Sequence, residues 1–214
     1  MSKTTNLKLR ASKEIELIKS FAETAEKDLK NYVKEQRLTR KAITYLFEEG
    51  RPEMIQVYVN TVFPDFCKFE FKKYQTKVMK YADRKTLATY YMYHEVSANG
   101  EIELIKRGEV KPFAYYIANH GLTAKAFKFL VKEGSSELLE AYLANNNIAQ
   151  KALLFFIQHG SVSDVVMYFM GSSSDEKDLF IEKLNQLKNT TRYQEICEAN
   201  EIIGMHAMYM PPVS

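Results

Sequence analysis

The side chains that most often do chemistry are sparse in this chain of 214 residues. The histidines lack the His-Glu-x-x-His spacing that brings two imidazoles to one zinc ion on a helix. Cys67 and Cys197 are too few for a cysteine-rich zinc site or a disulfide framework. The glycines are isolated, so they do not form a phosphate-binding loop. We therefore expect no catalytic residue, no metal and no cofactor, and a chain that is not an enzyme.

One basic cluster could instead bind an anion. Seven basic and three acidic side chains lie between Asp65 and Lys85, which gives this segment a local charge of +4. A run of this kind is usually the solvated face of a helix. The alternative is a nucleic-acid interface, because a polyanion is bound by clustered Lys and Arg. Its residues would be Lys68, Lys72, Lys73, Lys77, Lys80, Arg84 and Lys85.

The whole chain is too balanced in charge to indicate a nucleic-acid binder, with 30 basic and 27 acidic residues and a net charge of +3. Gly and Pro occupy only 13 positions, fewer than the turns of an all-β fold require. No apolar run reaches the roughly 18 residues of a membrane span. With no cleavable leader and few cysteines, we expect a cytoplasmic protein without a membrane partner.

The elements that carry these side chains follow from an internal repeat. The segments 38–42, 122–126 and 148–152 are similar, and each ends in an Ala that is followed eight residues later by Gly. A Tyr follows each of these glycines after eight more residues. The same frame extends to six tyrosines, spaced 26, 32, 26, 26 and 26 residues apart. They are Tyr32, Tyr58, Tyr90, Tyr116, Tyr142 and Tyr168. A fixed period of this length is typical of a helical repeat protein.

Each repeat has the pattern of a helix hairpin. In the copy at 122–147, apolar residues recur every three or four positions up to Gly134, where we expect the first helix to end in a left-handed conformation. Ser135 and Ser136 can cap a second helix that runs through Tyr142 and Leu143. Two helices this short cannot bury their own apolar faces, so neighbouring hairpins must stack.

The predicted fold is therefore an all-α solenoid (α/α superhelix) of about six hairpins with a C-terminal helical cap. The repeats are expected in a domain at 1–173, with units near 12–37, 38–63, 70–95, 96–121, 122–147 and 148–173. Residues 174–214 should form capping helices, over 175–187 and 192–203, and an apolar tail from Gly204. A capping box is predicted from Ser173 and Glu176. The cap should cover the apolar end of the last unit, although the tail could be left for a partner.

The run from Gly134 to Leu143 resembles the second helix of an ankyrin repeat, in which Gly is followed by two free positions, an acid and two aliphatic residues. The Ala-to-Gly separation of eight, as from Ala152 to Gly160, matches the ankyrin first helix. The Thr-Pro-Leu-His tetrapeptide is missing, and each unit is shorter by about the length of the β-hairpin finger between ankyrin repeats. The resemblance covers about 38–170 and implies a binding scaffold without catalytic chemistry.

The tyrosines and the outer lysines suggest different roles. Apolar residues flank every tyrosine at i−3 and i+1, which favours rings buried in the seams between hairpins over rings presented to nucleic-acid bases. The exposed faces of the first helices are better candidates for recognition of another protein or peptide. Candidate partner-binding residues there are Lys41, Thr44, Lys125, Lys128, Lys132 and Lys151. We expect a protein-interaction scaffold or adaptor, with nucleic-acid binding as the alternative; the sequence does not define the oligomeric state.

Overall fold

The computed structural model describes residues 3–62, 68–91 and 94–209, and the side chains of 9–62, 73–91 and 94–208. The described residues form fifteen α-helices and no strand, so the prediction of an all-α chain is confirmed. The contacts divide the chain into two compact units, residues 1–107 and 108–214. Cys67 and the Pro64 region lie outside the described residues, as does the end of the predicted tail from Met210.

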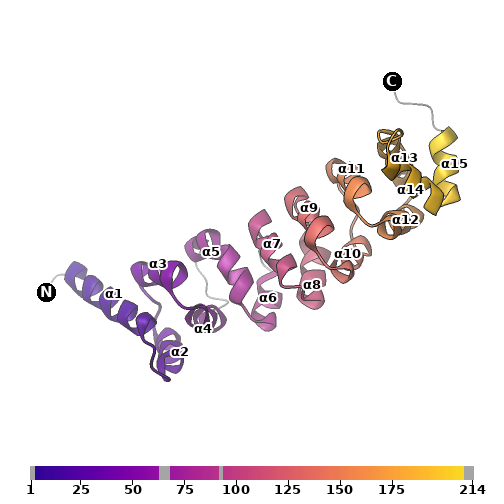
Figure 1. The fold of residues 1–214 in the computed structure, drawn as a ribbon. Coiled ribbons are helices and arrows are strands. Elements are labelled where there is room, and N and C mark those ends of the chain that lie inside the picture. Colours follow the sequence, from indigo (N-terminus) through magenta and orange to yellow (C-terminus); the bar gives the residue numbers. More distant parts are fainter. Residues whose placement is uncertain (1–2, 63–67, 92–93, 210–214) are drawn as a thin grey trace. The chain divides into compact units, whose positions relative to one another are not determined.

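The first unit contains seven helices. Helix α1 packs on α3 and α2 on α4, α4 packs on α5, and α5 packs on α7. Odd-numbered helices therefore stack on one another, and α2 and α4 do the same (Figure 1). The helices are α1 (Lys3–Lys19), α2 (Ala25–Glu35), α3 (Arg40–Glu49), α4 (Pro52–Val62), α5 (Lys68–Tyr81), α6 (Arg84–Tyr91) and α7 (Ala98–Lys106).

The second unit contains the other eight helices and repeats this scheme. Helix α8 packs on α10, α9 on α11 and α12 on α14, while α11 packs on α13 and α13 on α15. The helices are α8 (Val110–His120), α9 (Ala124–Glu133), α10 (Ser136–Leu143), α11 (Gln150–His159), α12 (Val162–Gly171), α13 (Ser174–Asn185), α14 (Thr191–Ala199) and α15 (Glu201–Tyr209).

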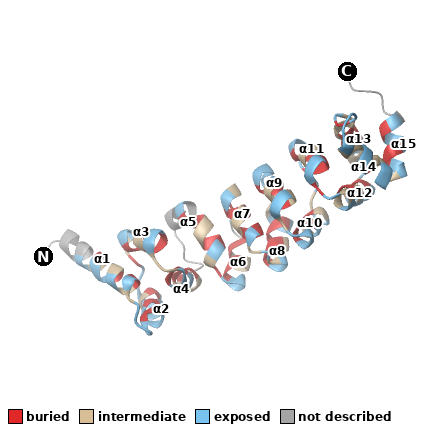
Figure 2. Ribbon diagram, viewed as in Figure 1, coloured by how far each residue is buried: buried red, intermediate tan, exposed pale blue. Residues whose placement is uncertain are grey.

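The core of each unit lies between stacked helices, where the buried residues gather (Figure 2). The recurrence of small residues allows close stacking: Ala42, Ala126 and Ala152 are almost fully buried. Gly100 has the matching position in α7, where a Cβ would clash with Cγ1 of Val96 and lie in ordinary contact, at 3.4 Å, with the side chain of Gln75 in α5. The described residues form fifteen helices, where six hairpins and two capping helices would give fourteen, and the superhelical arrangement remains a prediction.

The tyrosines lie where the repeat places them, in the core. Tyr58, Tyr90, Tyr116 and Tyr142 are at most 4% exposed. Tyr32 and Tyr168, in the first and last copies, are half-buried. Recognition by a row of exposed aromatic rings is therefore excluded for the four inner copies.

The prediction that the first helix of a repeat ends in a left-handed glycine is wrong for Gly134. Gly134 has an extended backbone (φ −76°, ψ 161°), not the left-handed conformation expected. Glycine is needed there for close approach, because a Cβ would lie 2.5 Å from the carbonyl oxygen of Leu130. Gly160 repeats this geometry, with a Cβ position 2.9 Å from the carbonyl oxygen of Phe156. The left-handed region is used instead by Gly108 and Gly121, at φ 66° and 70°.

Buried polar side chains fix the start of two helices in the first unit. Glu14 of α1 is 1% exposed and accepts hydrogen bonds from the backbone N–H and hydroxyl of Thr39, the N-cap of α3, at 2.9 and 2.6 Å. Gln75 of α5 accepts a 2.6 Å hydrogen bond from the N–H of Ser97, the N-cap of α7. Helices α1 and α5 thus position the first turns of α3 and α7, which stack on them.

Arginines stabilise the opposite ends of the odd-numbered helices. Arg51 donates to the carbonyl of Ser20 beyond α1 (2.9 Å), and Arg107 donates to the carbonyl of Ala82 beyond α5 (2.6 Å). Arg192 does the same in the second unit, on the carbonyl of Ile157 in the last turn of α11 (2.8 Å). A cation beside free C-terminal carbonyls satisfies their hydrogen bonding and opposes the helix dipole.

In the C-terminal segment, the prediction of a single helix over 192–203 is wrong. The helix breaks at Asn200, whose Oδ1 accepts hydrogen bonds from the N–H groups of Ile202 and Ile203 at 3.0 and 3.2 Å. Asn200 therefore caps a new helix, α15, and the expected tail is helical through Tyr209. The predicted capping box of Ser173 and Glu176 is present at the start of α13.

Candidate binding surfaces

Two lysines of the basic segment in the first unit bind groups of the neighbouring helix α3. Lys73 forms an ion pair with Glu48 of α3 at 2.8 Å, which raises the pKa of Lys73 and lowers that of Glu48. Lys77 donates to the backbone carbonyl of Phe47 in the last turn of α3. The Lys80 ammonium lies 5.3 Å from the centre of the Tyr81 ring. Two of these lysines therefore attach α5 to the end of α3.

Of the other four residues of the predicted nucleic-acid interface, two have described side chains. Lys68 and Lys72 belong to α5, but their side chains lie outside the described residues. Arg84 and Lys85 are exposed at the start of α6. Among the described cations of this interface, Lys73 and Lys77 thus bind another helix of the unit.

The predicted partner-binding residues fall in both units. Lys41 is exposed and Thr44 half-buried on α3, in the first unit. The other four are exposed lysines of the second unit, three on α9 and one on the adjacent α11. We call this group the lysine surface: Lys125, Lys128, Lys132 and Lys151.

Two lysines of the lysine surface lie against an aromatic ring. Phe155 is half-buried on α11, and the ammonium groups of Lys128 and Lys132 lie 5.2 and 5.4 Å from its ring centre. His159, one turn further along α11, packs against the same ring at a tilt of 47°, with 4.4 Å between the ring centres. The four-residue spacing from Lys151 to Phe155 to His159 is the sequence signal that could have identified this face.

Three lysines of this surface are not neutralised by an ion pair of the described residues. Within the described residues, Lys128, Lys132 and Lys151 form no ion pair. Bringing two ammonium groups against one ring costs repulsion, which the ring's negative π face only partly offsets. The arrangement can therefore accept an anionic group without breaking an existing ion pair.

The buried cluster of α1 could be mistaken for a catalytic site. Glu14 accepts from the hydroxyl of Tyr32 at 2.7 Å and from Arg10 Nε at 2.9 Å, in addition to its two hydrogen bonds from Thr39. Burial, followed by the hydrogen bond with Glu14, raises the pKa of Tyr32. All acceptor sites of the carboxylate are occupied by groups of the fold, so Glu14 has a structural role and is not available as a general base.

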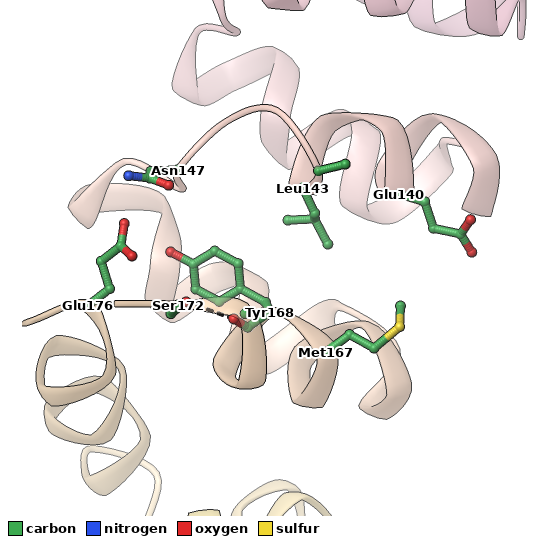
Figure 3. Close-up of a pocket in the computed structure, with 9 residues that line it drawn as sticks. Glu140, Leu143, Asn147, Met167, Tyr168, Ser172 and Glu176 are labelled. Atoms are coloured by element: carbon green, nitrogen blue, oxygen red, sulfur yellow. Dashed lines mark hydrogen bonds between the residues drawn. The ribbon is translucent and has the colours of Figure 1, made fainter. Parts of the chain in front are cut away.

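A small pocket of about 270 Å³ lies beside α10, α12 and the start of α13 (Figure 3). The hydroxyl of Tyr168 points toward the end where Asn147 and Glu176 lie, and Glu140 and Met167 lie at the other. Burial raises the pKa of Tyr168. Ser172 donates to the carbonyl of Tyr168 at 2.7 Å. Glu176 accepts from the N–H of Ser173 at 2.9 Å, so these polar groups stabilise helix ends and are not paired as nucleophile and base.

The described residues contain neither a metal-binding cluster nor a membrane-spanning helix. No group of three or more His, Cys, Asp or Glu side chains is placed to hold a metal ion. No described helix combines the length and hydrophobicity needed to cross a membrane.

The chain was compared with protein-family models, with curated proteins and with solved structures, and none of them matched.

Proposed function

We propose that this chain is a non-enzymatic protein-interaction module, and that its lysine surface binds an acidic segment of another protein or peptide. The observation that carries the proposal is the pair of ammonium groups, from Lys128 and Lys132, placed over Phe155 without an acidic partner. A carboxylate-rich ligand would supply the missing counter-charges. Lys125 and Lys151, on the same two helices, would extend the contact.

We also infer that the helix pairs are repeats of a solenoid, similar to ankyrin helix pairs without the β-hairpin finger. The support is the contact pattern within each unit, in which odd-numbered helices pack on the next odd-numbered helix, and α2 packs on α4, α8 on α10 and α12 on α14. A stack of this kind presents a continuous row of helix surfaces, which suits binding to an extended partner.

The lysine surface favours carboxylates over nucleic-acid bases. Single-stranded nucleic acid is bound by stacking of bases on exposed rings together with phosphate contacts. The Phe155 ring already has two lysines and His159 against it, so it offers little area for a base. Nucleic-acid binding through phosphates remains the alternative function that the experiment below distinguishes.

The test compares two probes on the full chain by fluorescence anisotropy: a labelled peptide of alternating Glu and Gly, and labelled poly(U) RNA. We expect the parent to bind the acidic peptide, with affinity that falls as salt is raised. The double variant Lys128→Glu and Lys132→Glu should raise the Kd about tenfold or more.

The matched control reverses two exposed lysines of the first unit, Lys80→Glu and Lys85→Glu, and should leave the Kd for the peptide unchanged. Equal loss in both double variants would show a general charge effect and contradict the proposal. Tight binding of poly(U) in place of the peptide, lost in either variant, would establish the nucleic-acid function instead.

A further inference from the structure

The last helix of the chain carries an apolar face that no described element covers. Ile202, Met205 and Met208 of α15 are 43, 53 and 76% exposed. The opposite side of the same helix is packed, because Ile203 and Ala207 are at most 1% exposed. A concentration of large exposed apolar side chains on one short helix is typical of an interaction site.

This face forms one wall of a groove between α14 and α15, with a volume of about 470 Å³. We call it the C-terminal groove. Tyr193 and Cys197 of α14 line it opposite Met205 and Met208. Gly204 lets the two helices approach, since a Cβ there would lie 3.4 Å from the carbonyl oxygen of Cys197. The volume is within the range of about 300 to 1,000 Å³ found for ligand pockets.

The charged residues of the groove all have one sign. Glu198 and Glu201 line it, and no Lys, Arg or His does. Their carboxylates lie beside an apolar floor, so the complementary ligand has apolar side chains flanked by basic ones. Methionine side chains adapt to ligands of different shape, as at other surfaces that bind amphipathic helices.

We propose that the C-terminal groove binds a basic amphipathic helix of another protein. Apolar side chains of that helix would enter between α14 and α15, and its Lys or Arg side chains would pair with Glu198 and Glu201. The docked helix would extend the packing already present, in which α15 lies against both α13 and α14.

Two other occupants of the C-terminal groove are the chain's own last residues and a second copy of the chain, and charge argues against both. The chain's own last five residues carry no basic side chain, so they cannot pair with Glu198 and Glu201. Two copies joined through α15 would bring the same acidic rims together, which is unfavourable. A basic helix from a different protein satisfies both the apolar floor and the rim.

The experiment measures binding of two labelled model helices to the full chain by fluorescence anisotropy. Both peptides have the same amphipathic pattern of Leu, with Lys on the polar face of one and Glu on that of the other. We expect the parent to bind the Leu/Lys peptide about tenfold or more tightly than the Leu/Glu peptide. The double variant Glu198→Lys and Glu201→Lys should reverse this preference.

A second pair of variants tests the apolar floor. Met205→Glu with Met208→Glu should raise the Kd for the Leu/Lys peptide about tenfold or more, and thermal unfolding should be unchanged because both side chains are exposed. The matched control is Met167→Glu with Met170→Glu, which replaces two methionines of α12 that are 51 and 48% exposed. That control should leave the Kd for the Leu/Lys peptide within about twofold.

Three results would overturn the proposal. One is equal binding of both peptides to the parent. Another is binding of the Leu/Lys peptide only after residues 210–214 are deleted, which would make the chain's own end the occupant. The third is self-association of the parent that Met205→Glu abolishes, which would make the occupant a second copy. The lysine surface is tested with an acidic probe and this groove with a basic one, so failure of one proposal leaves the other intact.

Discussion

The two units use different chemistry at the same position of their stacked helices. Gln75, fifteen residues before Tyr90, is a buried amide that hydrogen-bonds to the N–H of Ser97. Phe127, fifteen residues before Tyr142, instead packs its ring against Tyr142 and Phe156, at 5.1 and 6.1 Å between ring centres. At this position the first unit thus joins successive helices by a buried hydrogen bond and the second by aromatic contacts. Between α3 and α5 the first unit also stacks Phe47 on Tyr74, at 4.4 Å between ring centres.

The N-caps of the stacked helices differ in the same way. Thr39 and Ser97 begin the helices that follow Glu14 and Gln75, and each donates its N–H to that buried acceptor. Ala149 begins the helix that follows Phe127 and has no polar side chain. In these two helix pairs of the first unit, a buried polar residue of one helix therefore contacts the polar N-cap of the next.

The cations of the two units differ as well. Lys73, Lys77 and Arg107 of the first unit bind a carboxylate or helix-end carbonyls of their own unit. In the second unit Arg192 does so, but Lys128 and Lys132 have no such partner. Binding capacity is therefore expected where charged groups are not used by the fold.

The largest effect is expected from removing the buried carboxylate of the first unit. Glu14→Ala would leave Thr39, Tyr32 and Arg10 without their acceptor in a buried site. We expect the free energy of unfolding to fall by about 3 to 5 kcal/mol, as for other broken buried ionic networks. Chemical denaturation followed by circular dichroism measures it. Glu16→Ala, on the exposed side of α1, is the control and should change stability by less than about 0.5 kcal/mol.

A smaller loss is expected at Gln75. Gln75→Leu would keep the volume but leave the N–H of Ser97 and the carbonyl of Glu95 without this partner, at a cost of about 1 to 3 kcal/mol. Phe127→Leu in the second unit would lose ring contacts and no hydrogen bond. The comparison of units would be contradicted if Gln75→Leu left the denaturation curve unchanged.

Arg107 should contribute less, because its guanidinium is only half-buried and water can replace it at the carbonyls of Met79 and Ala82. Arg107→Met should lower the free energy of unfolding by about 1 kcal/mol. Hydrogen exchange would locate the effect, since the amides of the last turn of α5 should lose protection more than those of α1. Uniform loss of protection across the unit would argue against a local role at the helix end.

The period in the sequence predicted the helices well because it reflects packing. Tyrosines at intervals of 26 residues, and Ala or Gly at the matching place in the first helix, are what stacking of equal units requires. The roles of Glu14 and Gln75 could not be read in the same way, since their partners are 25 and 22 residues away and belong to another helix. The break at Asn200 was missed because an Asn inside an apolar pattern signals a cap only weakly.

The candidate surfaces were predicted less completely. The lysines of the second unit were predicted as exposed positions, but the ring of Phe155 beside two of them was not singled out, because it belongs to an apolar run in α11. In the segment 68–85, charge density alone did not show that Lys73 and Lys77 are bound within the unit. The local sequence shows the sign of a charged side chain, whereas the group that pairs with it can belong to a neighbouring helix.

The smallest effect on stability is expected at the lysine surface, and it gives the most direct comparison of the two units. Lys128→Glu with Lys132→Glu removes no ion pair or backbone hydrogen bond of the described residues, so the free energy of unfolding should change by less than about 0.5 kcal/mol. Lys73→Glu with Lys77→Glu makes the same change in charge but removes the ion pair with Glu48 and the hydrogen bond to the Phe47 carbonyl. Its melting temperature should be clearly lower than that of the α9 variant in the same buffer. If instead the α9 variant were the less stable of the two, those lysines would be structural, and the proposed binding of an acidic partner would lose its basis.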